Sequence, residues 1–156
     1  MENFSNWFAR CQGNWVSYRR YLTLPGKKDD TYATEFTIAV DKNKVSIKWD
    51  GDASSGDMNL TIEGDVLHRD IGYFTDEPND SQLTRLDIDT VVLVSEYDGM
   101  TFREEIRLLD NDTHRLRQTA VSYTHLRAHE NPEHRVCRVM VEKKKGGWGG
   151  GGGGGG

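Results

Sequence analysis

Nine short runs rich in β-branched and aromatic residues follow one another along the chain, each bounded by turn residues. The runs occupy residues 15–24, 32–40, 44–49, 57–63, 66–74, 81–87, 90–97, 101–109 and 114–120. Connectors such as DKN, EGD, YDG and DND are typical of hairpin turns and leave no room for crossover helices. The pattern therefore predicts an all-β antiparallel meander.

A meander of this length has two unpaired edges unless it closes on itself. Closure into a barrel removes both edges, and small up-and-down barrels can hold one ligand inside. We therefore expect an antiparallel barrel of nine to ten strands, with a two-sheet sandwich as the alternative. Phe4, Trp7 and Phe8 have helical spacing, which predicts a short N-terminal helix that ends by Gly13 and plugs one end of the barrel.

The composition changes sharply near residue 121. Ten of the 17 glycines lie between Gly146 and Gly156, which by itself would suit a flexible linker or tag. However, VSYTHLRAHE (121–130) and VCRVMVEKKK (136–145) resemble the two ends of a translated sequencing adapter. We therefore expect a C-terminally truncated domain over residues 1–120 and a non-native adapter read-through over residues 121–156 that ends in polyglycine.

Charge and composition exclude several classes of protein. The net charge is -5, and the part before residue 121 is more acidic still, which argues against a binder of the nucleic-acid backbone. No apolar run approaches the roughly 20 residues of a membrane span, and the N-terminus lacks the pattern of a secretory signal. Cys11 and Cys137 provide neither a disulfide framework nor a metal site, so we expect no metal and a reducing compartment.

Longer motifs point to a family. Gly13-Asn14-Trp15 matches the lipocalin G-x-W signature, in which the Trp has a structural role. The segments GNWVSYRRYL, SSGDMNLTIEGDVLHRDIGYFTDEP and SEYDGMTFREEIRLLDNDTHRLRQT resemble, in order and spacing, the S-type (CpcS/CpeS) phycobiliprotein lyases. The resemblance covers residues 3–120. The family has a further strand after RLRQT, and there this sequence departs from it.

The resemblance implies a lipocalin-like barrel with bilin lyase activity that acts largely as a chromophore chaperone. Such a protein binds a free phycobilin, either phycoerythrobilin or phycocyanobilin, as a transferred ligand and holds no permanent cofactor. It delivers the pigment to a cysteine of an apo-phycobiliprotein subunit, of phycoerythrin or phycocyanin, and forms a thioether. It would act in the cyanobacterial cytoplasm or algal plastid stroma, alone, as a homodimer or as a heterodimer with a paralogue.

Two other functions remain open from the sequence. A lipocalin-like carrier of a hydrophobic small molecule would have the same fold without transferase activity. A structural subunit that acts only by pairing with a paralogue is the third alternative. Substitution of the acid that faces the pigment separates the first alternative from a lyase, because a passive apolar cup does not need that acid.

A bilin carrier needs a carboxylate for the pyrrole nitrogens, guanidinium groups for the propionates and an apolar wall. Strand alternation places Glu105 on one face with Arg103 and Arg107, and Glu104 on the other face with Ile106 and Leu108. The resemblance suggests that an acid on this strand and an arginine on the next strand contact the bilin. We expect these two residues to be Glu105 and Arg115. The alternative is a solvated ladder of charges on the exterior.

Other candidates for ligand contacts follow from the same faces. They are Arg117, Arg107, Met58, Trp49, Arg69 and Tyr73. Met58 shares a face with Leu60 and Ile62, so it is either barrel core or a soft contact that tunes bilin binding. Alternation does not decide whether Arg19 or Arg20 faces inward. We expect Cys11 to be a packing residue, because the acceptor thiol of this family belongs to the client protein.

Overall fold

The structure is a computed structural model that describes residues 4–21, 31–51, 55–70, 78–97, 99–123 and 136–145. Its helix and first five strands are α1 (Phe4–Arg10), β1 (Gly13–Tyr21), β2 (Thr31–Asp41), β3 (Lys44–Gly51), β4 (Ser55–Glu63) and β5 (Val66–Arg69). The remaining strands are β6 (Asn79–Arg85), β7 (Thr90–Tyr97), β8 (Met100–Leu109), β9 (His114–Tyr123) and β10 (Val136–Lys144). The described residues include no helix with the length and apolar character that a membrane crossing needs.

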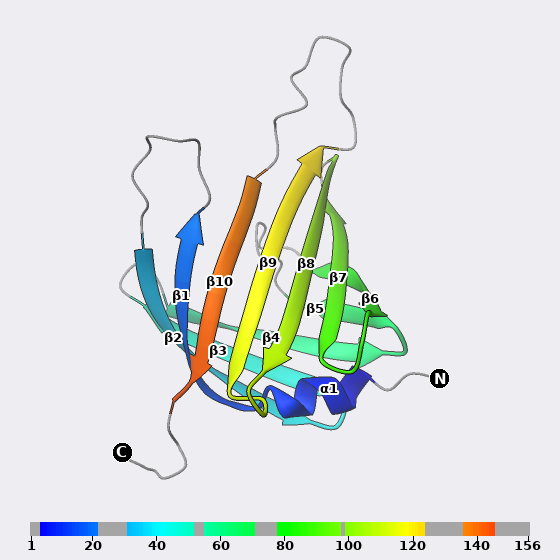
Figure 1. Ribbon diagram of the computed structural model, residues 1–156. Helices are drawn as coiled ribbons and strands as arrows, with labels where there is room; N and C mark the ends of the chain where they lie inside the picture. Colours follow the sequence, from blue (N-terminus) through cyan, green and yellow to red (C-terminus); the bar gives the residue numbers. More distant parts are fainter. Residues whose placement is uncertain are drawn as a thin grey trace, which may run out of the picture.

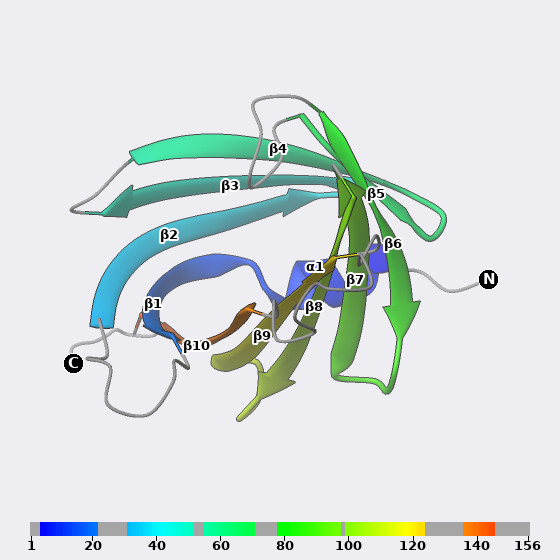
Figure 2. The ribbon, with the colours of Figure 1, turned by 90° about the horizontal axis from the view of Figure 1, so that it is seen from above.

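These strands form a closed antiparallel barrel, in the order β1-β10-β9-β8-β7-β6-β5-β4-β3-β2 (Figure 1). Seen from above, β2 to β4 form one wall of the ring, and β1, β10, β9 and β8 form the opposite wall (Figure 2). Each strand therefore has a hydrogen-bonded partner on both sides, which removes the edges of the meander. The prediction of an all-β barrel is confirmed, and the two-sheet sandwich is excluded.

The tight turns that the sequence predicts connect the expected strands. Asp41 pairs with Lys44, so DKN closes the β2–β3 hairpin with two connecting residues. Glu63 pairs with Val66 in the same way across the β4–β5 hairpin. Gly64 has a φ of 62° in this second turn, a conformation that a glycine adopts without steric cost.

The ring closes through β10, which pairs with β1 on one side and with β9 on the other. Trp15 stands opposite Lys144, and Arg117 stands opposite Met140. The closing strand and the last three residues of β9 both belong to residues 121–156. The identification of that segment as adapter read-through stays a prediction, because strand formation does not distinguish native sequence from a surrogate.

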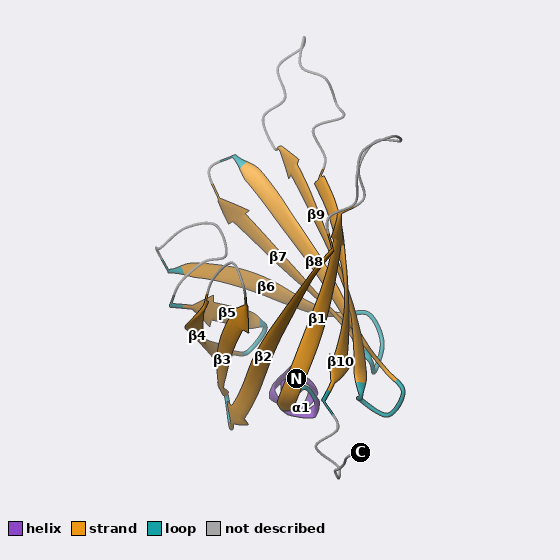
Figure 3. Ribbon diagram, turned by 90° about the vertical axis from the view of Figure 1, so that its left-hand side faces the viewer, coloured by secondary structure: helices purple, strands orange, loops and turns teal. Residues whose placement is uncertain are grey.

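The N-terminal helix α1 closes one end of the barrel, at the bottom of Figure 1 and seen end-on in Figure 3. Its apolar face is buried against the core, and Trp7 donates a hydrogen bond from Nε1 to the carbonyl of Asp89 at 3.0 Å. Trp15 is completely buried and donates from Nε1 to the carbonyl of Cys11 at 2.8 Å. These contacts confirm that the G-x-W tryptophan is structural and that Cys11 is buried in the packing.

Candidate functional site

Strand β8 presents Glu104, and not Glu105, to the interior. Glu104 is 6% exposed and shares the inner face with buried Ile106 and Leu108. Glu105 lies on the outer face, where its Oε1 is 3.5 Å from Nη1 of Arg103. The prediction that Glu105 faces inward is wrong. The physical reason is that burial of the two aliphatic side chains fixes the register, and the period of two turns Glu104 inward with them.

Strand β9 presents two arginines to the same interior. Arg115 is 5% exposed and stands opposite Leu108, and Arg117 stands opposite Ile106. The inward direction expected for both arginines is therefore observed. Arg107 is different, since it lies on the outer face of β8 and its Nε donates to Oγ1 of Thr90 at 3.1 Å.

The inward charges form a chain of ion pairs across three strands. Nη2 of Arg117 contacts Oε2 of Glu104, and Nη1 of Arg117 lies 3.0 Å from Oε2 of Glu142 on β10. Arg115 donates to Oε1 of the same Glu142 from Nε at 2.8 Å and from Nη2 at 2.7 Å. Thr119 Oγ1 donates to Glu104 Oε2 at 3.3 Å. The two carboxylates therefore share Arg117, and Glu142 bridges both arginines.

Aromatic rings support the arginine at one end of this chain. The guanidinium carbon of Arg115 lies 5.3 Å from the ring centre of Trp15 and 5.6 Å from that of Phe36. The two rings are stacked, with centroids 6.4 Å apart and an interplanar angle of 10°. Cation–π attraction and the Glu142 carboxylate therefore both hold Arg115 in place.

Both interior acids are ionised at neutral pH. Burial opposes ionisation of Glu104, but the guanidiniums of Arg117, Arg69 and Arg115 together lower its pKa below the ordinary value of 4.5. The pKa of Glu142 is also lowered, because Arg115 and Arg117 outweigh the effect of its burial. The Oε1 atom of Glu104 is buried and accepts no hydrogen bond within the described residues. An ionised oxygen in this environment can accept a hydrogen bond from an N–H or O–H group of a ligand.

The other expected ligand residues are spread over the opposite wall. Arg69 is 4% exposed on β5 and donates from Nη1 to Ser95 Oγ at 3.4 Å. Met58 on β4 is buried in the core, and Trp49 on β3 is half-buried against it. Tyr73 lies outside the described residues. The structure therefore brings together Arg115 and Arg117, links Arg69 to them through its electrostatic effect on Glu104, and places Glu105 and Arg107 on the outer face.

Sequence reasoning missed both carboxylates of this site. A signal for Glu104 was available, since Ile106 and Leu108 two and four residues later mark its face as the buried one. Glu142 had no such signal. Its partners lie on β9, and only the register of β10 against β9 places Glu142 opposite Arg115.

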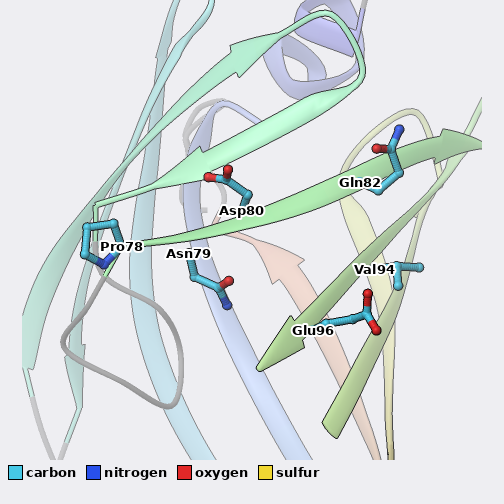
Figure 4. Close-up of a pocket in the computed structure, with 6 residues that line it drawn as sticks. All are labelled: Pro78, Asn79, Asp80, Gln82, Val94 and Glu96. Atoms are coloured by element: carbon cyan, nitrogen blue, oxygen red, sulfur yellow. The ribbon is translucent and has the colours of Figure 1, made fainter. Parts of the chain in front are cut away.

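An open pocket of about 570 Å³ lies beside β6 and β7 (Figure 4). Its lining residues are Pro78, Asn79, Asp80, Gln82, Val94 and Glu96. Asp80, Gln82 and Glu96 are exposed, whereas Ser81 and Ser95 turn into the barrel and are buried. None of the expected ligand residues that the structure describes lines this pocket, so it is not the interior slot that the sequence predicts.

At the level of the ion pairs, side chains fill the barrel interior. The exposed fraction of Glu142 is zero, so no water-sized space reaches it, and Arg115 and Glu104 are nearly as inaccessible. The expectation of an open slot beside Arg115 is therefore not met in this chain. A ligand that contacts these groups must displace a side chain.

No family model matches the chain. A curated relative from Nostoc sp., named "Putative phycocyanobilin lyase CpcS 2", is 26% identical, in a match that covers 74% of this chain and 79% of the relative. The S-type phycobiliprotein lyase CpeS of Guillardia theta has a similar structure, with a TM-score of 0.59 at 14% identity and 92% coverage of both chains. The resemblance to S-type lyases is confirmed.

The same fold occurs in a larger protein. A structure of unknown function from the DUF3598 family of Nostoc punctiforme gives a TM-score of 0.61 at 14% identity. The match covers 86% of this chain and 47% of that one, so this chain spans about half the length of that protein. At these identities the two structural likenesses establish the barrel fold that the chain shares with an S-type lyase.

Proposed function

We propose that this chain binds a free phycobilin inside its barrel and delivers the pigment to a cysteine of an apo-phycobiliprotein subunit. The names of the Nostoc relative and of the Guillardia lyase support the class of reaction. The observation that carries the proposal at the level of residues is Glu104, a buried and ionised acid whose Oε1 accepts no hydrogen bond from the described residues. We propose residues 1–120 as the functional domain.

Glu104 replaces Glu105 as the proposed acid. Its Oε1 would accept hydrogen bonds from the pyrrole N–H groups of the bilin and would favour the protonated tetrapyrrole. Protonation makes the ethylidene of the first ring a better electrophile. The client thiol then adds across this double bond: a C–S bond forms, the C=C π bond breaks, and the thiol proton ends on the neighbouring carbon. No atom leaves, and the addition needs no oxidant.

The remaining contacts follow from the charges and the apolar wall. Arg115 and Arg117 are proposed to hold the propionates of the bilin, because a guanidinium binds a carboxylate through two hydrogen bonds. Arg69 is proposed as a further cation on the opposite wall. Met58 and Trp49 supply apolar and aromatic surface for the flat pigment.

The interior charges argue against a plain carrier of a lipid-like molecule. Guanidiniums and carboxylates turn inward from the described strands, and burial of such groups is costly unless each is paired. A passive apolar cup has no use for that cost. A barrel whose ligand bears N–H donors and carboxylates needs such charged groups to bind it.

The test compares Glu104→Gln with Glu105→Gln, which change adjacent acids on opposite faces of β8. Each variant is incubated with phycocyanobilin or phycoerythrobilin and then with an apo-phycobiliprotein subunit, and the pigment that resists denaturation is measured. We expect Glu104→Gln to slow the covalent transfer by about a hundredfold, as loss of an acid–base group does. Glu105→Gln should transfer pigment at the parent rate.

Folding is checked by far-UV circular dichroism of both variants. Equal transfer by the two variants would remove Glu104 from the mechanism. Absence of any change in the visible spectrum when the parent chain meets either pigment would contradict bilin binding itself.

A further inference from the structure

Glu142 occupies a complete carboxylate-binding site inside the barrel. One of its oxygens accepts two hydrogen bonds from Arg115, at 2.8 and 2.7 Å, and the other lies 3.0 Å from Arg117. Its exposed fraction is zero. A carboxylate bound by two guanidiniums in a buried setting is the arrangement with which proteins bind carboxylate ligands. Here the chain itself supplies the carboxylate.

The charge count shows what the loss of this carboxylate leaves behind. The ion-pair chain and the buried Arg69 together hold five charged side chains, which are Arg69, Arg115, Arg117, Glu104 and Glu142. They sum to +1, and without Glu142 they sum to +2. Glu104 forms its ion pair with Arg117, whereas Arg115 forms its ion pair with Glu142, so the loss of Glu142 takes the counter-ion from Arg115. A buried Arg115 without this counter-ion attracts an anionic ligand.

We propose that Glu142 is an intramolecular competitor of the ligand, and that a carboxylate of the bound pigment takes its place on Arg115 and Arg117. The proposal rests on the proposed function, because it concerns the same interior site. The carboxylate that competes with the ligand comes from β10. Glu142 belongs to residues 121–156, so the competition is a property of this chain and of the strand that closes its barrel.

Competition predicts how the affinity depends on the ligand's own carboxylates. When a propionate replaces Glu142, the arginines exchange one carboxylate for another. The free acid of the pigment then binds little more tightly than its ester. When Glu142 is absent, the propionate neutralises the Arg115 guanidinium, which would otherwise stay buried without its counter-ion. The free acid then binds more tightly than its ester, and the difference in binding free energy is that of a charge-assisted hydrogen bond.

The experiment measures dissociation constants for phycocyanobilin and for its dimethyl ester by absorbance titration. For the full-length parent chain we expect the two constants to agree within about threefold, because the exchange of carboxylates is nearly neutral. For Glu142→Gln we expect the diacid to bind at least about tenfold more tightly than the ester. Glu35→Gln is the control, since it removes an exposed acid that pairs with Lys145 outside the barrel.

Each outcome decides one question. A Glu142→Gln variant that binds both pigments without the gain in acid preference overturns the competition and leaves the proposed function standing. If Glu142→Gln does not fold, the parent decides, because a parent that prefers the diacid about tenfold or more also overturns it. If no folded chain binds the acid or the ester, the proposed function has failed, and the competition fails with it.

Discussion

Trp49 on β3 lies directly against Gly56 on β4, so that a Cβ added at Gly56 would be 2.6 Å from Cζ2 of the indole. The two residues are cross-strand partners in the β3–β4 pair. The absence of a side chain at residue 56 therefore lets the ring lie flat on the neighbouring strand and fixes its direction against the core.

Gly56→Ala should force the Trp49 ring off the strand. Insertion of a methyl group into a filled contact costs about 1–3 kcal/mol, and we expect a loss of that size in the free energy of unfolding by urea. In a Trp49→Ala background the clash is gone, so the same substitution should cost much less. Equal losses in the two backgrounds would mean that the ring is not held by this contact.

Glu104 should make the stability depend on acid pH. Its pKa is lower in the folded chain than the ordinary value of 4.5, so the folded state binds fewer protons than the unfolded state below that pH. The contribution is complete above about pH 5.5 and is lost as the pH falls through the folded pKa.

We therefore expect Glu104→Gln to reduce the slope of unfolding free energy against pH, between about pH 5 and pH 3, by up to about 1.4 kcal/mol per pH unit. Urea titrations across that range measure the slope. Glu105→Gln should keep the parent slope, because it leaves Glu104 and its arginines in place. A Glu104→Gln slope as steep as the parent's would assign the acid dependence to other groups.

Arg10 should stabilise helix α1, because its side chain binds the β6–β7 turn and the β8–β9 turn at once. Its Nη2 lies 2.6 Å from Asp89 and 2.8 Å from Asp112, and Nη1 donates to the carbonyl of Ile88 at 2.7 Å. Arg10→Met keeps the aliphatic stem and removes these bonds. Because the side chain is 29% exposed, solvent screens the pairs, and we expect a loss of about 1 kcal/mol.

The salt dependence of that loss identifies its cause. In 1 M NaCl the difference between Arg10→Met and the parent should shrink, since the Debye length falls to about 3 Å. Arg103→Met is the matched control, because Arg103 is half exposed and its pair with Glu105 is long. If Arg103→Met loses as much unfolding free energy as Arg10→Met, the contacts of Arg10 have no specific stabilising role.

Cys11 should be unreactive in the folded chain. Burial raises the pKa of its thiol and outweighs the opposing effect of Arg115, so the thiol stays protonated at neutral pH. In a Cys137→Ser background, we expect iodoacetamide at about pH 8 to alkylate native Cys11 at least about a hundredfold more slowly than the urea-unfolded chain. Comparable rates, followed by mass spectrometry, would contradict a buried packing role.

The sequence predicted the strand pattern well because alternation and turn chemistry are local properties. The runs at 90–97 and 101–109 correspond closely to β7 and β8, and DKN and EGD close the expected hairpins. Alternation also separated Glu104 from Glu105 correctly into opposite faces. It does not state which face is inside, and the choice needed the burial of Ile106 and Leu108 to be weighed above the charge of the neighbouring arginines.

The partners of the interior charges could not be predicted in the same way. Arg115 and Glu142 meet only because β10 pairs with β9 in one register, and a long-range register is a property of the closed ring. The position of Trp49 over Gly56 likewise depends on cross-strand pairing. Local patterns therefore indicated the strands and the candidate arginines, and tertiary pairing determined which acids reached them.

Because β10 closes the ring, the barrel cannot be completed until this strand has been translated. Among the described strands β1 is the first to be translated, yet its neighbour on one side is β10, which comes after all the others, with Trp15 opposite Lys144. Until then β1 and β9 each present a row of backbone donors and acceptors to other nascent chains. Translation by many closely spaced ribosomes should therefore favour aggregation into inclusion bodies. Slow translation initiation at low temperature should favour barrels that fold separately.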